Sequence, residues 1–347
     1  MIEPWQLTVV QAAVQPVYYR NGPLRRSALA ENLERACELV RSGARVYGSR
    51  LYVFPEFFLQ GFELGRSTGD WIAASLRIPG PETERLGQVA REAHAYIAGM
   101  AYEVVDDFPG RYFNTAFLID PNGEVVLRYR KFYSLTSKTT PADIYDEYTR
   151  RYGGPESLFP VIDTPFGRIG MLGCYDINFP EVARCLALRG AEILLHLTSE
   201  GSGPHQAEDG GWTIARRARA YENTCYLAMA NTGPFLDSGL PPGVSHGHSQ
   251  IIGFDGRVMH MAEGAGETLI TATIDIEALR RQRTKKRFNF LAELIPAVHA
   301  PIYAQATGWP LNAYLDRPLA SVQNNVDLYD EVLEAQRTKG LRVPPSA

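Results

Sequence analysis

The segment GRIGMLGCYD, residues 167–176, carries the main signal for the fold of this chain. Its apolar run stops at Cys174, and polar residues then lead into a helical segment from Pro180 to Leu188. We therefore predict a strand-to-helix turn that lifts Cys174 out of a sheet, beside backbone N–H groups that lower the pKa of its thiol. The competing interpretation is an ordinary buried cysteine, because free cysteine is among the most buried residue types.

Strands and helices alternate in the same order in both halves of the chain. Buried strands alternate with amphipathic helices in each half, and antiparallel strands follow them. The helices of one half can cover only one face of its sheet, so the two bare sheet faces should pack together. We predict an α/β protein, a four-layer αββα sandwich of two mixed β-sheets, over residues 1–285. Strands are expected at 7–14, 51–54, 95–102, 113–119, 125–129, 158–163, 168–173, 193–197, 225–231, 249–253, 258–261 and 269–274, and helices at 25–46, 82–94, 180–188, 211–223 and 276–283.

Residues 286–347 have a different composition, and we predict that they form a C-terminal extension. The segment is rich in proline and in aromatic residues, with one helix expected at 326–338. Such a tail is costly to leave in water, because each buried ring contributes about 1.5–3 kcal/mol. We expect the extension to pack on its own domain or on a neighbouring subunit.

Composition narrows the class of protein. The 347 residues carry a formal net charge of −4 and no basic run, which argues against a nucleic-acid partner. Residues 1–5 lack the pattern of a signal peptide, and no apolar run is long enough for a membrane span. The irregular spacing of the cysteines fits neither a disulfide framework nor a zinc site. We expect a soluble, cytoplasmic protein in a reducing compartment; its cysteines are Cys37, Cys174, Cys185 and Cys225.

A nucleophilic thiol needs a base and a donor for the oxyanion that it creates, and two segments offer these groups. Glu56 follows a buried strand and is flanked by proline and phenylalanine, so we predict that poor solvation raises its pKa. Lys131 ends the strand that begins at Val125, and its ammonium is suited to an oxyanion. Taken alone, each residue also fits a surface position, a carboxylate at a strand end and a solvated lysine.

Three separated motifs in this chain resemble those of the nitrilase superfamily, the carbon–nitrogen hydrolases with a Glu-Lys-Cys triad. They are PEF at 55–57, YRK at 129–131 and GCYD at 173–176, the last followed by FPE at 179–181. The likeness covers roughly residues 6–285, and it implies the same αββα fold. Weaker matches follow in order at Trp212 with RRARAYEN (216–223), GHS (247–249) and GFDG (253–256).

The resemblance also implies roles for these residues. Glu56 would take the thiol proton, and Cys174 would attack a carbonyl carbon. Lys131 and the backbone N–H of Tyr175 would hold the oxyanion, ammonia or an amine would leave, and water would hydrolyse the thioester. The resemblance implies no metal and no other cofactor.

Many members carry a second glutamate between the lysine and the cysteine, shortly before a glycine. Glu147 fits best here, with Glu156 as the competing choice, because the stretch 132–146 is unusually long. We expect that stretch to shape the pocket as a lid. Aromatic residues beside the triad in sequence suit either a substrate pocket or the core; they are Phe57, Tyr133, Tyr175 and Phe179.

The residues after the cysteine favour amide hydrolysis, because amidases and carbamoyl hydrolases often show Cys-Tyr-Asp whereas nitrilases usually show Cys-Trp-Glu. The alternatives are a nitrilase that converts a nitrile to a carboxylate and ammonia, and an N-carbamoyl amide hydrolase. We expect a small-molecule amide or nitrile as the partner, and a homodimer or a larger homo-oligomer.

Three other classes remain open at this point. A metal hydrolase is one, because His246 and His248 stand at i, i+2, with His196 and His205 in the same half. A scaffold protein that has lost its chemistry is the second, although no triad member is missing. Acyl transfer to an amine or to hydroxylamine is the third.

Overall fold

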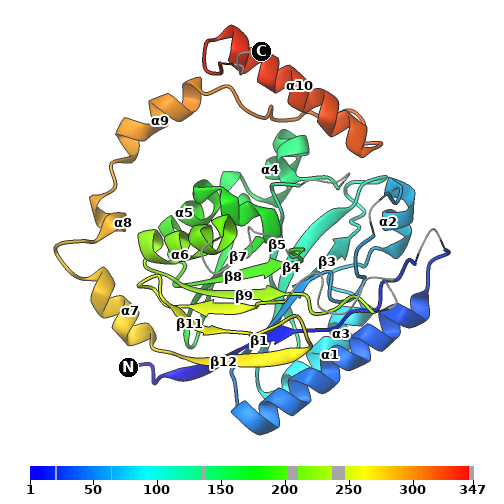
Figure 1. The fold of residues 1–347 in the computed structure, drawn as a ribbon, viewed down its shortest axis with the longest axis vertical. Coiled ribbons are helices and arrows are strands. Elements are labelled where there is room, and N and C mark those ends of the chain that lie inside the picture. The colour runs from blue at the N-terminus through cyan, green and yellow to red at the C-terminus, as the bar shows by residue number, and fades with distance from the viewer. Residues whose placement is uncertain (20–21, 64, 135–137, 202–209, 237–246, 344–347) are drawn as a thin grey trace.

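Two six-stranded sheets face each other in the computed structural model of the chain, which describes residues 1–19, 22–63, 65–134, 138–201, 210–236 and 247–343 (Figure 1). The strand orders are β12-β1-β2-β3-β4-β5 and β11-β10-β9-β8-β7-β6. The strands of the first sheet are β1 (Trp5–Gln11), β2 (Leu51–Glu56), β3 (Tyr96–Glu103), β4 (Phe113–Ile119), β5 (Val125–Arg130) and β12 (Thr268–Ile274). Those of the second are β6 (Val161–Thr164), β7 (Gly167–Gly173), β8 (Ile193–Thr198), β9 (Tyr226–Asn231), β10 (Gln250–Ile252) and β11 (Val258–Met261).

Both sheets are mixed. Strands β1, β2 and β3 run parallel, as do β7, β8 and β9, and the flanking strands are antiparallel. Helices α1 (Arg26–Tyr47) and α3 (Pro81–Ala93) cover the outer face of the first sheet (Figure 1). Helices α5 (Pro180–Leu188) and α6 (Gly211–Asn223) cover the second. The predicted four-layer αββα sandwich is confirmed.

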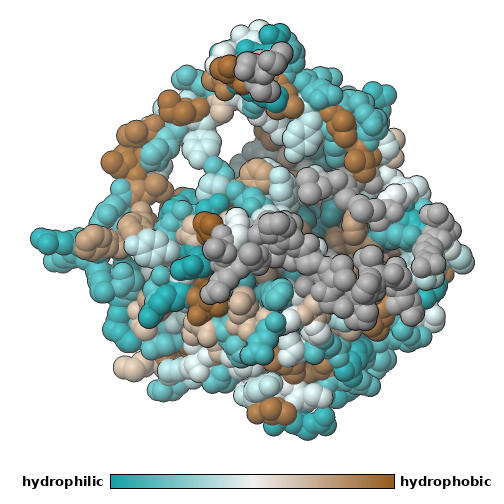
Figure 2. All heavy atoms as spheres, viewed as in Figure 1, coloured by the Kyte–Doolittle hydropathy of each residue, from teal (hydrophilic) through white to brown (hydrophobic). Residues whose placement is uncertain are grey.

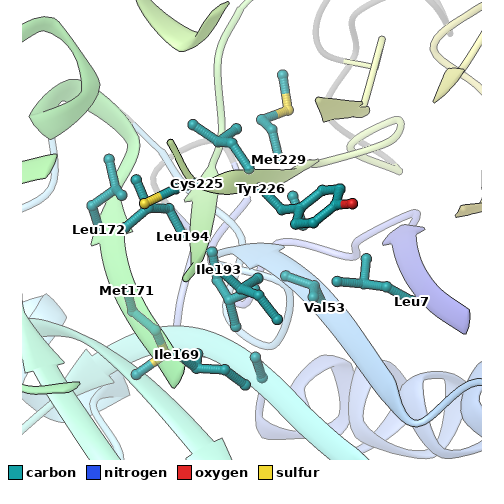
Figure 3. Close-up of a cluster of buried hydrophobic side chains, with 14 of the residues drawn as sticks. Leu7, Val53, Ile169, Met171, Leu172, Ile193, Leu194, Cys225, Tyr226 and Met229 are labelled. Carbon is teal, nitrogen blue, oxygen red and sulfur yellow. The ribbon is translucent and has the colours of Figure 1, made fainter. Parts of the chain in front are cut away.

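The core between the sheets is apolar. Strand β2 packs against β8 and β9, and Figure 3 shows Leu7 and Val53 of the first sheet beside Ile193 of the second. All three side chains are fully buried. A second cluster fills the space between the first sheet and helices α1 and α3. These buried runs on both faces of the central strands explain why the strands read as continuous apolar segments in the sequence.

Turn and cap residues fix the ends of several elements. The turn at 120–123 joins β4 to β5, and the turn at 253–257 joins β10 to β11. Asp275 caps α7 (Ile276–Arg283), because its side chain accepts a hydrogen bond of 2.8 Å from the backbone N–H of Ala278.

Several short elements were not predicted from the sequence. They are α2 (Thr68–Ala74), η1 (Pro141–Ile144), α4 (Tyr145–Tyr152), η2 (Pro155–Leu158) and η3 (Cys174–Asn178). The short helix η1 lies within the stretch 132–146 that we expected to form a lid, and α4 begins at the end of that stretch. Tyr148 anchors α4 in a cluster with Phe108 and Phe113. Within the described residues, no helix has both the length and the apolar character needed to cross a membrane.

The C-terminal extension leaves the domain after α7 and arches back across the molecule (Figure 1). It carries α8 (Phe290–Glu293), α9 (Pro296–Gln305) and α10 (Val322–Thr338). It touches its own domain at separate points: the Tyr303 hydroxyl donates to Glu181 over 2.8 Å, and Arg111 donates to the carbonyls of Tyr314 and Leu315 over 2.7 and 3.0 Å. Figure 2 shows hydrophobic residues exposed along the arch, with an open gap between the arch and the domain.

Candidate active site

The three residues of the predicted triad stand at the ends of three strands. Glu56 is the last residue of β2, Lys131 follows β5, and Cys174 follows β7. The Lys131 Nζ donates to Glu56 Oε1 over 2.8 Å, and the Cys174 thiol also hydrogen-bonds the Glu56 carboxylate. Strands β2 and β5 belong to one sheet and β7 to the other, so face-to-face packing of the sheets brings these side chains together.

Glu56 is 1% exposed and is surrounded by cationic and polar donors. Its Oε1 accepts from Asn114 Nδ2 and from Lys131, and Lys138 Nζ lies 3.9 Å away. Burial alone raises the pKa of the Glu56 carboxyl, but the charges of Lys131 and Lys138 and the hydrogen bonds from Lys131 and Cys174 outweigh burial and lower that pKa. The prediction of a raised pKa was therefore wrong, because these ammonium groups are distant in sequence.

Cys174 occupies a strained position at the turn. Its φ is +45°, in the left-handed region that residues other than glycine rarely adopt, so the backbone reverses sharply at the nucleophile. Burial, then the negative charge of Glu56, raises the pKa of the thiol to about 12, against the opposing charge of Lys131. The predicted lowering of this pKa was wrong, because burial and the charge of Glu56 dominate. Cys174 begins only the short η3, and helix α5 does not start until Pro180.

The buried carboxylate of Asp176 ties the nucleophile turn to the strand that carries Lys131. It accepts from the Tyr129 hydroxyl over 2.6 Å and from the backbone N–H groups of Tyr133 and Gly173 over 2.9 and 3.0 Å. The sequence analysis placed Asp176 within the GCYD motif but assigned it no role.

A second layer of polar residues supports Cys174 from the neighbouring strand β8. His196 Nε2 lies 2.9 Å from the Cys174 carbonyl oxygen, and the Thr198 side chain hydrogen-bonds the thiol. The Thr198 hydroxyl also donates to Glu200 over 3.0 Å, and Glu200 pairs with Arg216 of α6 at 2.8 Å. The sequence analysis named His196 only as a candidate metal ligand and assigned no role to Thr198, Glu200 or Arg216, although Arg216 stands in the helix motif used for the resemblance.

The structure does not bring either candidate for a second glutamate to Glu56. Glu147 lies on α4, where its carboxylate accepts from Arg150 over 2.6 Å and from Arg151 over 2.7 Å. Those two hydrogen bonds lower the pKa of the Glu147 carboxyl to about 2. Glu156 is exposed on η2.

The four aromatic candidates divide between two places. Tyr133 and Phe179 stack with ring centroids 3.4 Å apart, and Tyr175 meets Phe179 edge-on at 5.4 Å, so these three gather beside the nucleophile turn. Phe57 instead lies in a buried cluster with Tyr102, at a centroid distance of 4.8 Å.

The histidines considered for a metal site are only partly described. His246 and His205 lie outside the described residues, and His196 is buried against the Cys174 carbonyl. Burial and the charge of Arg216 hold the pKa of His196 well below its ordinary value, so its imidazole is neutral. In the described part of the chain, no three His, Cys, Asp or Glu side chains gather as a metal site would need.

Comparison with known proteins places this geometry in context. The model of the carbon-nitrogen hydrolase family matches residues 6–284. The omega-amidase NIT2 of Xenopus tropicalis is 31% identical over 279 residues, which cover 80% of this chain and 91% of the relative. Its counterpart in Bos taurus is 31% identical over 257 residues, covering 74% and 87%.

Solved structures share the fold. An amidase from Nesterenkonia sp. AN1 superposes with a TM-score of 0.61 and 22% identity, covering 86% of this chain and 99% of that amidase. A variant of the same amidase, with the acetamide moiety of fluoroacetamide attached to its active-site cysteine, superposes with a TM-score of 0.62 and 20% identity, covering 87% and 99%.

Proposed function

Because this chain belongs to the carbon–nitrogen hydrolase family, we propose that it hydrolyses a non-peptide amide to a carboxylate and ammonia through a thioester on Cys174. The observation that carries the proposal is that one buried carboxylate, that of Glu56, hydrogen-bonds both the Lys131 ammonium and the Cys174 thiol. Base, oxyanion donor and nucleophile are thus within contact of one another, as nucleophilic catalysis requires.

The first half of the reaction forms the thioester. The Cys174 sulfur bonds to the amide carbon while its proton passes to Glu56, and the carbonyl π electrons move to oxygen. The Lys131 ammonium and the backbone N–H of Tyr175 hold that oxyanion. The oxyanion then collapses, the C–N bond breaks, and the nitrogen leaves as ammonia with the proton that Glu56 carried.

The second half regenerates the enzyme. Water gives a proton to Glu56 and adds its oxygen to the thioester carbon, the C–S bond breaks, and the thiol regains its proton. The raised pKa of Cys174 supports this order of events, because a neutral thiol in the resting enzyme needs Glu56 to accept its proton during attack. The scheme uses no metal and no cofactor, and Glu147 and Glu156 have no part in it.

We propose an amide as the substrate, with nitriles and N-carbamoyl compounds as the alternatives. The relatives named above are omega-amidases, which makes omega-amides the first class to test. We propose that Tyr133, Tyr175 and Phe179 line the acyl pocket, since they gather beside the nucleophile.

The decisive experiment measures ammonia release from omega-amides, other aliphatic and aromatic amides, carbamoyl compounds and the matching nitriles. Release from an amide, and its loss in Cys174→Ala, is the expected result. If ammonia is released from nitriles but from no amide, the protein is a nitrilase and the proposal of an amidase is wrong.

We also propose that the protein forms a homodimer or a larger homo-oligomer, in which the C-terminal extension (residues 286–347) packs against a neighbouring subunit. Large apolar side chains are exposed on the outer helices and along the arch in Figure 2, and water contact with them is costly. They include Leu188, Ile214, Tyr221, Phe288, Ile295, Val298 and Ile302. Four free cysteines support a reducing compartment, and we propose the cytoplasm.

A further inference from the structure

A second ammonium group lies beside Glu56, in addition to that of Lys131. Lys138 is 4% exposed, and its Nζ lies 3.9 Å from Glu56 Oε1. The same Nζ stands over the aromatic rings of Phe57 and Tyr102, 5.0 and 5.4 Å from their centroids. A lysine is almost never fully buried without a partner, so this position calls for a function.

The charges that face Lys138 come from several elements. Burial and the like charge of Lys131 lower the pKa of the Lys138 ammonium to about 7, while attraction to Glu56, and to Cys174 and Asp176 when these are ionised, acts in the opposite direction. The phenol of Tyr102, whose ring the ammonium covers, has a pKa raised well above its ordinary value by burial and remains neutral. Lys138 is therefore the cation of this cluster that can change its charge near neutral pH.

The two lysines differ in what they contact. The charge of Lys131 lowers the pKa of both Glu56 and Cys174, so it favours negative charge before and after the thiol proton moves. The Lys138 ammonium attracts negative charge on both groups, but its interaction with the Glu56 carboxylate, 3.9 Å away, is larger than its interaction with Cys174. A positive charge on Lys138 therefore opposes transfer of the proton from sulfur to Glu56.

We propose that Lys138 is a positioning residue that sets the proton affinity of Glu56, holding it as a weak base when Lys138 is charged and releasing a stronger base when Lys138 gives its proton to solvent. This inference rests on the proposed function, because it assigns Glu56 as the acceptor of the Cys174 proton. The bonds that form and break in the reaction stay the same; only the readiness of Glu56 to accept that proton changes.

The test is the pH profile of kcat/KM for ammonia release between pH 6 and 8, on an amide that the wild-type protein turns over. If the charged form of Lys138 supports about a tenth of the activity of the neutral form, kcat/KM of the wild type rises about fivefold across this interval with an inflection near 7, as the neutral fraction of Lys138 grows. For Lys138→Met, kcat/KM at pH 6 equals that of the wild type at pH 8, and its pH profile has no inflection. Lys138→Arg keeps its charge and stays about tenfold below the wild type at pH 8, also with no inflection.

Lys286→Met, which changes an exposed lysine of the extension, is the matched control and keeps the wild-type profile. The inference is overturned if both Lys138 variants keep the wild-type inflection, or if Lys138→Met folds with an unchanged melting temperature and is inactive at every pH. If Lys138→Met does not fold, Lys138→Arg alone carries the test, because a neutral inflection that persists in it contradicts the role of Lys138. Failure of the proposed function gives a different result, namely that the wild type releases no ammonia from any amide.

Discussion

Replacing Glu56 by glutamine removes the negative charge that two buried ammonium groups share. Unit charges 2.8 Å apart attract by about 6 kcal/mol at an effective dielectric constant near 20, and those 3.9 Å apart by about 4 kcal/mol. The variant does not lose all of this energy, because Lys138 can give up its proton and so avoid an unpaired buried charge. We therefore expect Glu56→Gln to lower the free energy of unfolding by about 3–5 kcal/mol, the range for breaking a buried ion pair.

The same substitution removes the base. An amide side chain cannot take the thiol proton, so kcat should fall by a factor of about 10²–10⁴. Urea unfolding followed by circular dichroism and an ammonia-release assay measure the two effects. Glu56→Asp keeps the negative charge but moves it away by one methylene. It should lose activity with a smaller loss of stability. If Glu56→Gln does not fold, this variant still separates the loss of catalysis from the loss of stability.

Glu147→Gln is the matched control. This carboxylate pairs with Arg150 and Arg151 on the surface of α4, and ion pairs in contact with solvent add little to stability. Its removal should leave kcat unchanged. The reasoning is refuted if Glu56→Gln turns over at the wild-type rate, or if Glu147→Gln loses activity to the same extent as Glu56→Gln.

Three further outcomes are expected. Cys174→Ala should lose all ammonia release while its unfolding free energy, from urea titration, stays within about 1 kcal/mol of the wild type, because one small side chain is changed; residual turnover would place the nucleophile elsewhere. Arg216→Met removes the guanidinium that pairs with the buried Glu200 carboxylate at 2.8 Å, so the same titration should show a loss of about 3–5 kcal/mol, and an unchanged midpoint would contradict the pairing. Truncation after Lys285 should reduce the mass seen by light scattering towards that of a monomer, and an unchanged oligomer would remove the extension from the interface.

The sequence alone was sufficient for the fold and for the residues at the strand ends. Apolar runs that stop at Glu56 and Cys174 mark the carboxyl ends of buried strands, where polar side chains emerge from a sheet. Lys131 follows β5, whose sequence VVLRYR is less apolar. The resemblance drawn from three short motifs is confirmed by the family match over residues 6–284.

The electrostatics of the site could not be predicted in the same way. The neighbours of Glu56 in sequence are apolar, which indicated a raised pKa, but the groups that decide the pKa arrive from β4, from the end of β5 and from Lys138. Contacts of this kind depend on how two sheets and a connecting segment meet, and no local pattern encodes that.

The position of Glu147 could not be predicted from the sequence either. Its position between Lys131 and Cys174, shortly before a glycine pair, suggested by resemblance that it is the second glutamate of the site. The unpredicted helix α4 instead sets Glu147 one turn before Arg150 and Arg151, at i+3 and i+4, where oppositely charged side chains meet on a helix surface.

The most direct test of this account is to find the acyl group on the enzyme during turnover. The protein is mixed with an amide that it hydrolyses and quenched with acid within the first turnovers, and its peptides are analysed by mass spectrometry. The account predicts an acyl adduct, removable by hydroxylamine, on the peptide that contains Cys174. Steady ammonia release with the acyl group on Cys37, Cys185, Cys225 or a non-cysteine residue would contradict it.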